Sequence, residues 1–144
     1  MINFLKRVVE KVIPPSKQLF LRLLTYKILS KVDNEIIYAD KILKKRRRFL
    51  DIGSNVGIYS YFFSKKFKNL EAFEPIKEIT YRLSALESKN INLHHLALSN
   101  KNGYLKFYIP IKNGKLIPPI ASLEKKTKPY EKRIIKVKTL DSFN

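Results

Sequence analysis

A short segment that combines an acid with two glycines is the first place where the sequence could do chemistry. It reads Asp51-Ile52-Gly53-Ser54-Asn55-Val56-Gly57 and follows the apolar pair Phe49-Leu50. Glycines allow a tight turn in which the backbone approaches a ligand, and an acid just before that turn suits a ligand with positive charge. The G-x-G-x-x-G pattern of dinucleotide sites is not met, because Asn55 replaces the second glycine and Gly57 comes too early. The segment therefore favours a cationic nucleoside such as S-adenosylmethionine over a pyrophosphate.

Glu74 is a second acid in a similar position. It ends the apolar run that begins at Leu70, and Pro75 follows and stops a strand. The carboxyl ends of parallel strands meet at one edge of a sheet, so we expect Glu74 and Asp51 to reach one crevice. Two ribose hydroxyls could donate to the Glu74 carboxylate, at about 1.5–3 kcal/mol for each bond to a charged acceptor. Glu74→Ala is therefore expected to weaken cofactor binding with little loss of fold.

The surrounding pattern predicts the elements that position these acids. Short apolar runs alternate with helical periodicity, which is typical of a parallel sheet with crossover helices, and the prediction is an α/β domain of βαβαβ order. Strands are expected over 49–52, 70–73 and 91–96, with helices ending near 66 and spanning 79–89. Asn102-Gly103 predicts a hairpin between Ala97-Leu98 and the strand 104–109. A loop over 110–132 and a last strand over 134–140 complete the chain. Helices over 5–13 and 34–43 precede it, and between them a helix that Ser16 caps extends to Ile28.

Composition limits the classes of protein that remain. The chain has 144 residues and no cysteine, so it affords one core and excludes disulfides, thiolate zinc sites and cysteine nucleophiles. Its 30 Lys and Arg against 12 Asp and Glu give a formal charge of +18, which favours polyanionic partners. AT-rich coding is an equally good explanation of that excess. No specific nucleic-acid partner is expected, because the sequence lacks the aromatic pattern of single-strand platforms.

The N-terminal region carries neither an export signal nor a spanning helix. Glu10, Lys11 and Pro14-Pro15 interrupt the start, and Arg22 and Lys27 interrupt the most apolar stretch. A cytoplasmic location is expected. The basic helices are expected to pack on the domain, and lying on an anionic membrane surface is the alternative. Lys44–Arg48 is expected to be a solvated entry to the first strand, with phosphate or lipid contact as the alternative.

His94-His95 is the other candidate for chemistry. A histidine base could activate a hydroxyl acceptor, but adjacent strand residues point to opposite faces, so at most one of the pair could face the crevice. A structural role is the favoured interpretation. No third ligand of suitable spacing supports a metal site, and the catalytic base stays unassigned.

Four segments together resemble a known family. They are Phe49–Ser60, Ala72-Phe73-Glu74-Pro75, Ala97-Leu98-Ser99 before Gly103, and Val137-Lys138-Thr139-Leu140-Asp141-Ser142. In this order they resemble the FkbM-type family of S-adenosylmethionine-dependent methyltransferases. The resemblance implies a class I Rossmann-like fold and methyl transfer to a hydroxyl oxygen of a sugar, other glycan or natural-product acceptor.

The resemblance also implies roles for particular residues. Asp51 and Gly53 would lie near the methionine part of the cofactor, Glu74 would bind the ribose, and the region 96–98 would line the adenine. The cofactor-binding residues expected from the motif and the resemblance are Asp51, Gly53, Ser54, Asn55, Gly57, Glu74 and Ala97.

Members of that family continue into a fourth core strand beyond the Thr-Leu-Asp-Ser segment. We therefore expect residues 1–45 to form a helical extension and 46–144 to form the cofactor-binding half of a Rossmann-like domain, truncated at its C-terminus. The first strand, 49–52, would then be an open edge. The alternative is a truncated, non-catalytic module that binds the cofactor or a basic partner surface. A nucleic-acid binder acting through charge alone and a nicotinamide dehydrogenase are weaker alternatives.

Overall fold

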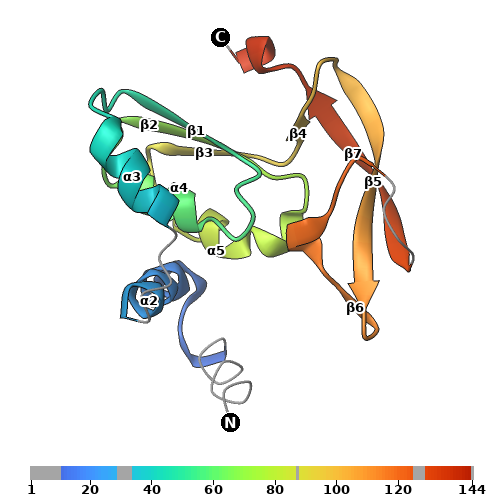
Figure 1. The fold of residues 1–144 in the computed structure, drawn as a ribbon, viewed down its shortest axis with the longest axis horizontal. Coiled ribbons are helices and arrows are strands. Elements are labelled where there is room, and N and C mark those ends of the chain that lie inside the picture. The colour runs from blue at the N-terminus through green and yellow to red at the C-terminus, as the bar shows by residue number, and fades with distance from the viewer. Residues whose placement is uncertain (1–10, 29–33, 87, 125–128, 144) are drawn as a thin grey trace.

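The computed structural model describes residues 11–28, 34–86, 88–124 and 129–143, and it is a mixed α/β structure with two sheets (Figure 1). The expected helix over 5–13 falls largely outside the described residues. None of the helices in the described part of the chain combines the length and apolar character that spanning a bilayer requires.

The first sheet is parallel and has the order β1-β2-β3. Its strands are β1 (Arg48–Ile52), β2 (Asn69–Phe73) and β3 (Ile91–His94). Helix α4 (Ile58–Ser64) connects β1 to β2, and a 3-10 turn η1 (Lys77–Ile79) with the short helix α5 (Tyr81–Ser84) connects β2 to β3. The expected βαβαβ order is therefore confirmed. Within the described sheet, β1 is an edge strand, as expected.

A hydrophobic core lies between this sheet and its helices. Phe63 of α4 is fully buried and stacks on Phe49 of β1, with ring centroids 4.3 Å apart. Leu70 and Ala72 of β2 are also fully buried in this cluster. Strand residues thus alternate, and one face of the sheet packs on α4.

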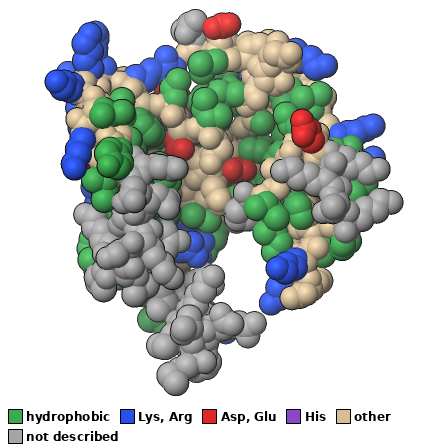
Figure 2. All heavy atoms as spheres, viewed as in Figure 1, with side chains coloured by type: hydrophobic (Ala, Val, Ile, Leu, Met, Phe, Trp, Pro, Cys, Tyr) green, Lys and Arg blue, Asp and Glu red, His purple; other side chains and the backbone are tan. Residues whose placement is uncertain are grey.

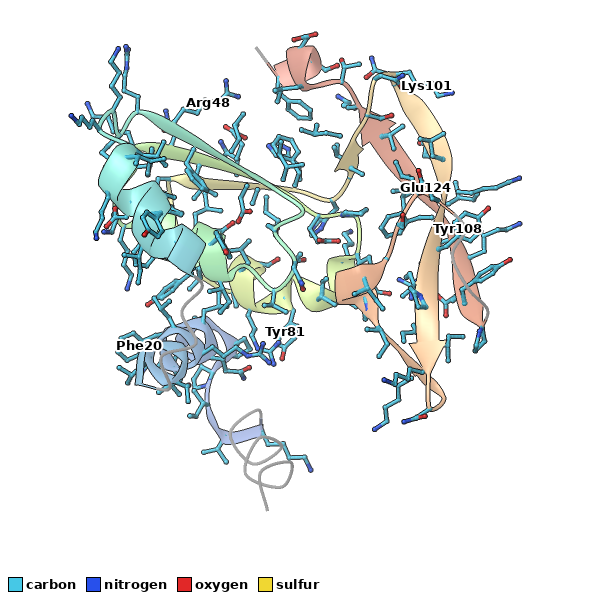
Figure 3. The ribbon with its side chains drawn as sticks, viewed as in Figure 1. Phe20, Arg48, Tyr81, Lys101, Tyr108 and Glu124 are labelled. Carbon is cyan, nitrogen blue, oxygen red and sulfur yellow. The ribbon has the colours of Figure 1, made fainter. Side chains whose placement is uncertain are left out.

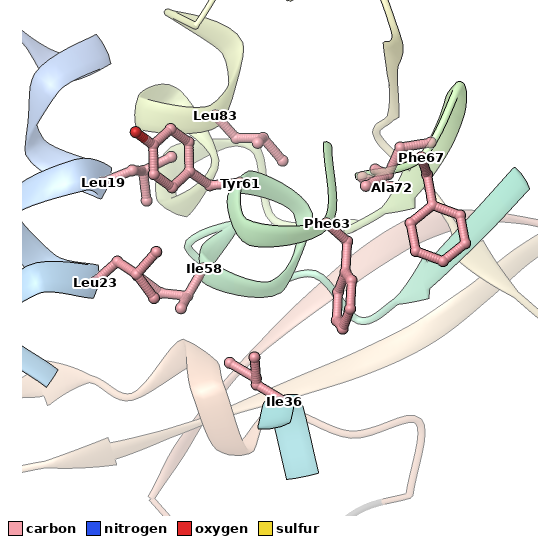
Figure 4. Close-up of a cluster of buried hydrophobic side chains, with 10 residues drawn as sticks. Leu19, Leu23, Ile36, Ile58, Tyr61, Phe63, Phe67, Ala72 and Leu83 are labelled. Atoms are coloured by element: carbon pink, nitrogen blue, oxygen red, sulfur yellow. The ribbon is translucent and has the colours of Figure 1, made fainter. Parts of the chain in front are cut away.

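The N-terminal helices belong to the same core. Helix α2 (Pro15–Ile28) buries Leu19 and Leu23, and Figure 4 shows both directed at Ile58 and Tyr61 of α4. Helix α3 (Asn34–Ile42) buries Ile36 in the same cluster. The expectation that these helices pack on the domain is confirmed. The sequence predicted Ser16 as the cap of this helix, and this is wrong: α2 begins at Pro15, so Ser16 lies within its first turn, where the preceding proline is well suited.

The second sheet has the order β4-β7-β5-β6. Its long strands β5 (Gly103–Lys112) and β7 (Tyr130–Lys138) are antiparallel, and β4 (Ala97–Leu98) runs parallel to β7. Strand β6 (Lys115–Leu116), the turn η2 (Pro118–Ile120) and the turn η3 (Leu140–Phe143) complete it. A second cluster of buried residues packs on its inner face; it comprises Ile76, Phe107, Ile109, Ile135 and Val137.

The hairpin expected at Asn102-Gly103 is wrong. The two strands that flank this dipeptide, β4 and β5, each pair with β7 instead of with each other. The Asn102 side chain accepts hydrogen bonds from the Thr139 backbone N–H at 2.9 Å and the Ser142 hydroxyl at 3.2 Å, so it ties this turn to the end of β7. The antiparallel hairpin joins β5 to β6 at Asn113-Gly114, where both residues have positive φ.

Two other predicted elements are shorter than expected. The helix predicted over 79–89 is a 3-10 turn followed by the single helical turn α5, because Ile79 packs on the second cluster whereas Leu83 is buried in the first. One continuous helix would not place both side chains in separate cores. The strand predicted over 91–96 ends at His94.

Candidate functional site

A pocket of about 300 Å³ lies where β1 and β2 end. One wall comes from the loops after these strands and from β4, and the other comes from β5 and the segment around η2. Figure 2 shows acidic side chains near the middle of the visible face, among hydrophobic ones, with most Lys and Arg toward its rim. The lining residues are Ile52, Gly53, Asn55, Phe73, Glu74, Pro75, Ala97, Leu98, Phe107, Pro118, Ala121, Ser122 and Leu123.

The glycine turn, residues 53–57, forms part of the first wall of the pocket. The backbone N–H groups of Gly53 and Ser54 both donate to the Phe73 carbonyl, at 2.9 and 3.0 Å, so the turn folds over the end of β2. Gly53 has φ +79°, a left-handed conformation that favours glycine. A Cβ at Gly57, where φ is +89°, would lie 2.9 Å from the Leu83 Cβ. Glycine is therefore required at Gly57 both by conformation and by packing against α5.

The Glu74 carboxylate is the buried acid of the pocket. Its side chain is 6% exposed, and its two oxygens accept hydrogen bonds from the backbone N–H groups of Asn55 and Ile76, each at 3.0 Å. Burial raises the pKa of Glu74; those two hydrogen bonds oppose the shift, and the nearby Asp51 charge adds to it. Glu74 therefore holds the glycine turn to β2 and also faces the pocket.

Asp51 lies at the end of the adjacent strand in different surroundings. Its Oδ2 accepts a hydrogen bond from the Ser60 hydroxyl of α4 at 2.6 Å, and it is not among the pocket-lining residues. Burial raises the pKa of Asp51, and the Ser60 hydrogen bonds partly offset this. The two acids are near enough to interact electrostatically, but Asp51 faces the helix layer whereas Glu74 faces the pocket.

The other cofactor-binding residues predicted from the sequence also divide into those that line the pocket and those that do not. Gly53, Asn55 and Ala97 line the pocket with Glu74, whereas Ser54 and Gly57 do not. The buried Ser54 Oγ and Asn55 Oδ1 both lack a hydrogen-bond partner, which is costly for buried polar atoms. Asn55 thus lines the pocket, and its side-chain acceptor oxygen is buried without a partner.

The second wall of the pocket was not predicted from the sequence. It consists of Phe107 and the segment from Pro118 to Leu123, most of which was assigned to a loop. The only signal was the apolar run Leu116-Ile117-Pro118-Pro119-Ile120-Ala121 between lysine-rich stretches. A backbone pairing between Tyr108 and Ser122, with N···O distances of 2.9 and 3.0 Å, fixes this segment against β5.

The two histidines lie apart from the pocket lining. His94 Nε2 contacts Glu71 Oε2 at 2.6 Å, and its ring stacks on Phe73 with centroids 4.8 Å apart. Burial, with Lys77 nearby, lowers the pKa of His95. Within the described residues, no three His, Cys, Asp or Glu side chains come together as a metal site would require.

The pocket can hold a ligand that has hydroxyl or ammonium donors on one side and an apolar, ring-shaped part on the other. The Glu74 carboxylate supplies acceptors, while Phe107 and Leu123 supply apolar surface. Comparison with models of known families, with curated proteins and with solved structures finds no match for this chain.

Proposed function

We propose that the chain is an S-adenosylmethionine-dependent methyltransferase that transfers the methyl group to a hydroxyl oxygen. The observation that carries the proposal is the Glu74 carboxylate, buried in a pocket wall at the carboxyl ends of two parallel strands and held there by two backbone N–H groups. Ligands of open α/β sheets bind at this edge.

The donor and acceptor inventory of the pocket fits the cofactor. A carboxylate has about four acceptor positions, and Glu74 uses two of them on Asn55 and Ile76. Two positions remain for a vicinal pair of ribose hydroxyls. The Asn55 Oδ1 is buried without a partner and would become an acceptor for the ammonium of a methionine moiety after rotation of its side chain, and the apolar second wall suits an adenine ring. The volume of about 300 Å³ is at the small end of ligand pockets.

The cofactor supplies an electrophilic methyl carbon when it is bound. The residues of this chain hold and orient the nucleoside, and the second wall shields it from water. Most of the rate enhancement is then expected from alignment of the reactants and little from covalent catalysis. The expectation that the acceptor is a hydroxyl group of a sugar, other glycan or natural product comes from the resemblance of residues 49–142 to the FkbM-type family.

The test is calorimetric titration of the purified chain with S-adenosylmethionine, S-adenosylhomocysteine and, as a comparison, NAD⁺. We expect the first two to bind with one site per chain and NAD⁺ not to bind. Absence of binding by both sulfur nucleosides would overturn the proposal. A second assay measures tritium transfer from methyl-labelled cofactor to a panel of sugars; binding without transfer to any acceptor would support the non-catalytic alternative.

A further inference from the structure

A second candidate binding surface lies on the opposite side of the β5–β7 pair from the pocket. Side chains of the two strands alternate between a buried inner face, which includes Ile109 and Val137, and an exposed outer face. Figure 3 shows Tyr108 directed away from the rest of the molecule on this side. We call this surface the outer ribbon face; its members are Tyr104, Lys106, Tyr108, Pro110, Tyr130, Lys132, Ile134 and Lys136.

The strand register brings aromatic rings and lysines together on the outer ribbon face. Tyr104 pairs with Lys136, and Tyr108 pairs with Lys132. Directly paired residues project from the same face of a sheet, so each of these rings has an ammonium group as its cross-strand neighbour. The rings of Tyr108 and Tyr130 also meet edge to face, with centroids 5.1 Å apart. The result is a strip in which rings and positive charges alternate.

The outer ribbon face is open to solvent, and its charged side chains are positive. Tyr104 is 71% exposed and Ile134 is 62% exposed, and Lys106, Lys132 and Lys136 are exposed as well. The one acid within β5 and β7 is Glu131, which pairs with buried Ile109 and accepts a hydrogen bond from Arg133, so it belongs to the inner face.

Two features lie at the margin of the strip, beside β5. Glu124 lies beyond the β5 edge, in the segment that the backbone pairing between Ser122 and Tyr108 holds against β5. A shallow pocket of about 370 Å³ lies at the same edge, lined by Tyr104, Leu105, Lys106, Tyr108 and Leu123. It offers apolar and aromatic surface next to a lysine.

We propose that the outer ribbon face binds single-stranded nucleic acid without sequence preference. Ring faces accept unpaired bases of any identity, and interleaved lysines neutralise the phosphates that link them. Tyr104 and Tyr108 are four residues apart on one strand, about 13 Å, with Lys106 between them. Duplex DNA would use the lysines but not the rings, because its bases are already stacked. The exposed ring of Tyr104, with the partly exposed ring of Tyr108 on the same strand, therefore favours a single strand.

This arrangement of rings and lysines is not visible in the local sequence. Tyr104 and Tyr108 alternate with Lys106 along one strand, but their aromatic and basic neighbours come from β7, more than twenty residues later. Only the antiparallel register places Tyr130, Lys132 and Lys136 on the same face. The expectation that aromatic stacking residues are lacking therefore rested on local sequence alone.

The experiment measures fluorescence anisotropy of a labelled twenty-nucleotide oligo-dT with the full chain over a series of KCl concentrations. Three lysines on phosphates predict a slope of about −2 for log K against log salt concentration. Tyr104→Ala should weaken binding about fivefold or more, whereas Tyr104→Phe, which keeps the ring, should bind like the wild type. Because the Tyr104 side chain is highly exposed, the alanine variant should keep the fold, and circular dichroism checks this.

Two triple variants that remove the same charge distinguish binding at the outer ribbon face from general attraction to a basic protein. One removes the outer lysines (Lys106→Ala, Lys132→Ala, Lys136→Ala), and the other removes three exposed lysines near β1 (Lys44→Ala, Lys45→Ala, Lys68→Ala). The first should abolish most of the salt dependence and the second should leave it nearly intact. Equal effects of both triples, or equal affinity of Tyr104→Ala and wild type, would overturn the proposal. Tighter binding to duplex DNA, or to vesicles of phosphatidylglycerol, than to oligo-dT would overturn it as well.

Discussion

Substitution of Glu74 by glutamine tests how the pocket recognises a nucleoside. The carboxylate already accepts from the backbone of Asn55 and Ile76, which leaves two acceptor positions for ribose hydroxyls. A hydrogen bond to a charged acceptor contributes about 1.5–3 kcal/mol and a neutral one about 0.5–1.5 kcal/mol. Glutamine is neutral and keeps only one acceptor oxygen, so one ribose bond weakens to a neutral one and the other is lost. Together this costs about 2.5–4.5 kcal/mol, which corresponds to a roughly 70- to 2,000-fold weaker affinity for S-adenosylmethionine.

Glutamine is a better replacement than alanine at this position. Alanine would leave the N–H groups of Asn55 and Ile76 without their acceptor, at about 1–3 kcal/mol for each buried group. The expectation from sequence that Glu74→Ala leaves the fold nearly unchanged is thus not supported by these contacts. Glutamine keeps one acceptor oxygen, so thermal denaturation should show a smaller loss of stability than for Glu74→Ala.

Glu71→Gln is the matched control. It removes the same charge three positions earlier in the chain, within β2, but Glu71 contacts His94 on the sheet face away from α4 and does not line the pocket. Calorimetry should show an affinity within about twofold of wild type for this variant, on the scale of a charge that does not contact the ligand, because the Glu71 carboxylate makes its hydrogen bonds with His94 and Asn92 outside the pocket lining. Equal affinities of the Glu74→Gln and Glu71→Gln variants for the cofactor would refute the reasoning.

Three further predictions concern the scaffold of the site. In thermal denaturation, Gly57→Ala should lower the free energy of unfolding by about 2–4 kcal/mol, because it adds a clash with Leu83 to the strain of positive φ. Gly53→Ala should lower it by only about 1–2 kcal/mol, from strain alone. Equal losses of stability in the two variants would contradict the packing argument. Phe63→Ala should cost about 3–5 kcal/mol in urea denaturation, because the ring is fully buried, and a cost below 1 kcal/mol would contradict its place in the core. Burial raises the pKa of Asp51, so the folded state binds this proton more tightly than the unfolded chain does, and stability falls as the pH rises through the raised pKa. Asp51→Asn should therefore melt at a higher temperature than wild type at pH 7, with the difference vanishing near pH 3; a difference that grows toward low pH would have the wrong sign.

The parallel sheet was predictable because its signals are local. The strand expected over 49–52 is β1 at Arg48–Ile52, and the strand expected over 70–73 is β2 at Asn69–Phe73. Each is a short apolar run ended by a glycine turn or by Glu74-Pro75; β2 is largely buried, whereas the edge strand β1 is half-buried. The strand ends in turn located Gly53, Asn55, Glu74 and Ala97 on one pocket wall.

The second sheet was not predictable in the same way, because its pairings join distant segments. Nothing near Asn102-Gly103 reveals that Ala97 will pair with Val137, so the local turn signal led to the wrong hairpin. The true turn at Asn113-Gly114 precedes a strand of only two residues, too short to show alternation. The second pocket wall and the outer ribbon face depend on these long-range pairings and were missed for that reason.

The most direct test of the central claim is a titration of the isotopically labelled chain with S-adenosylhomocysteine, followed by amide resonances in NMR spectra. The proposal predicts that the largest shift changes fall on both walls of the pocket, at Gly53 and Asn55 on one side and at Ser122 on the other. Amides of the outer ribbon face, such as Lys136, should not move. Changes confined to that face, or none at saturating ligand, would contradict the claim that Glu74 and the glycine turn form a nucleoside site.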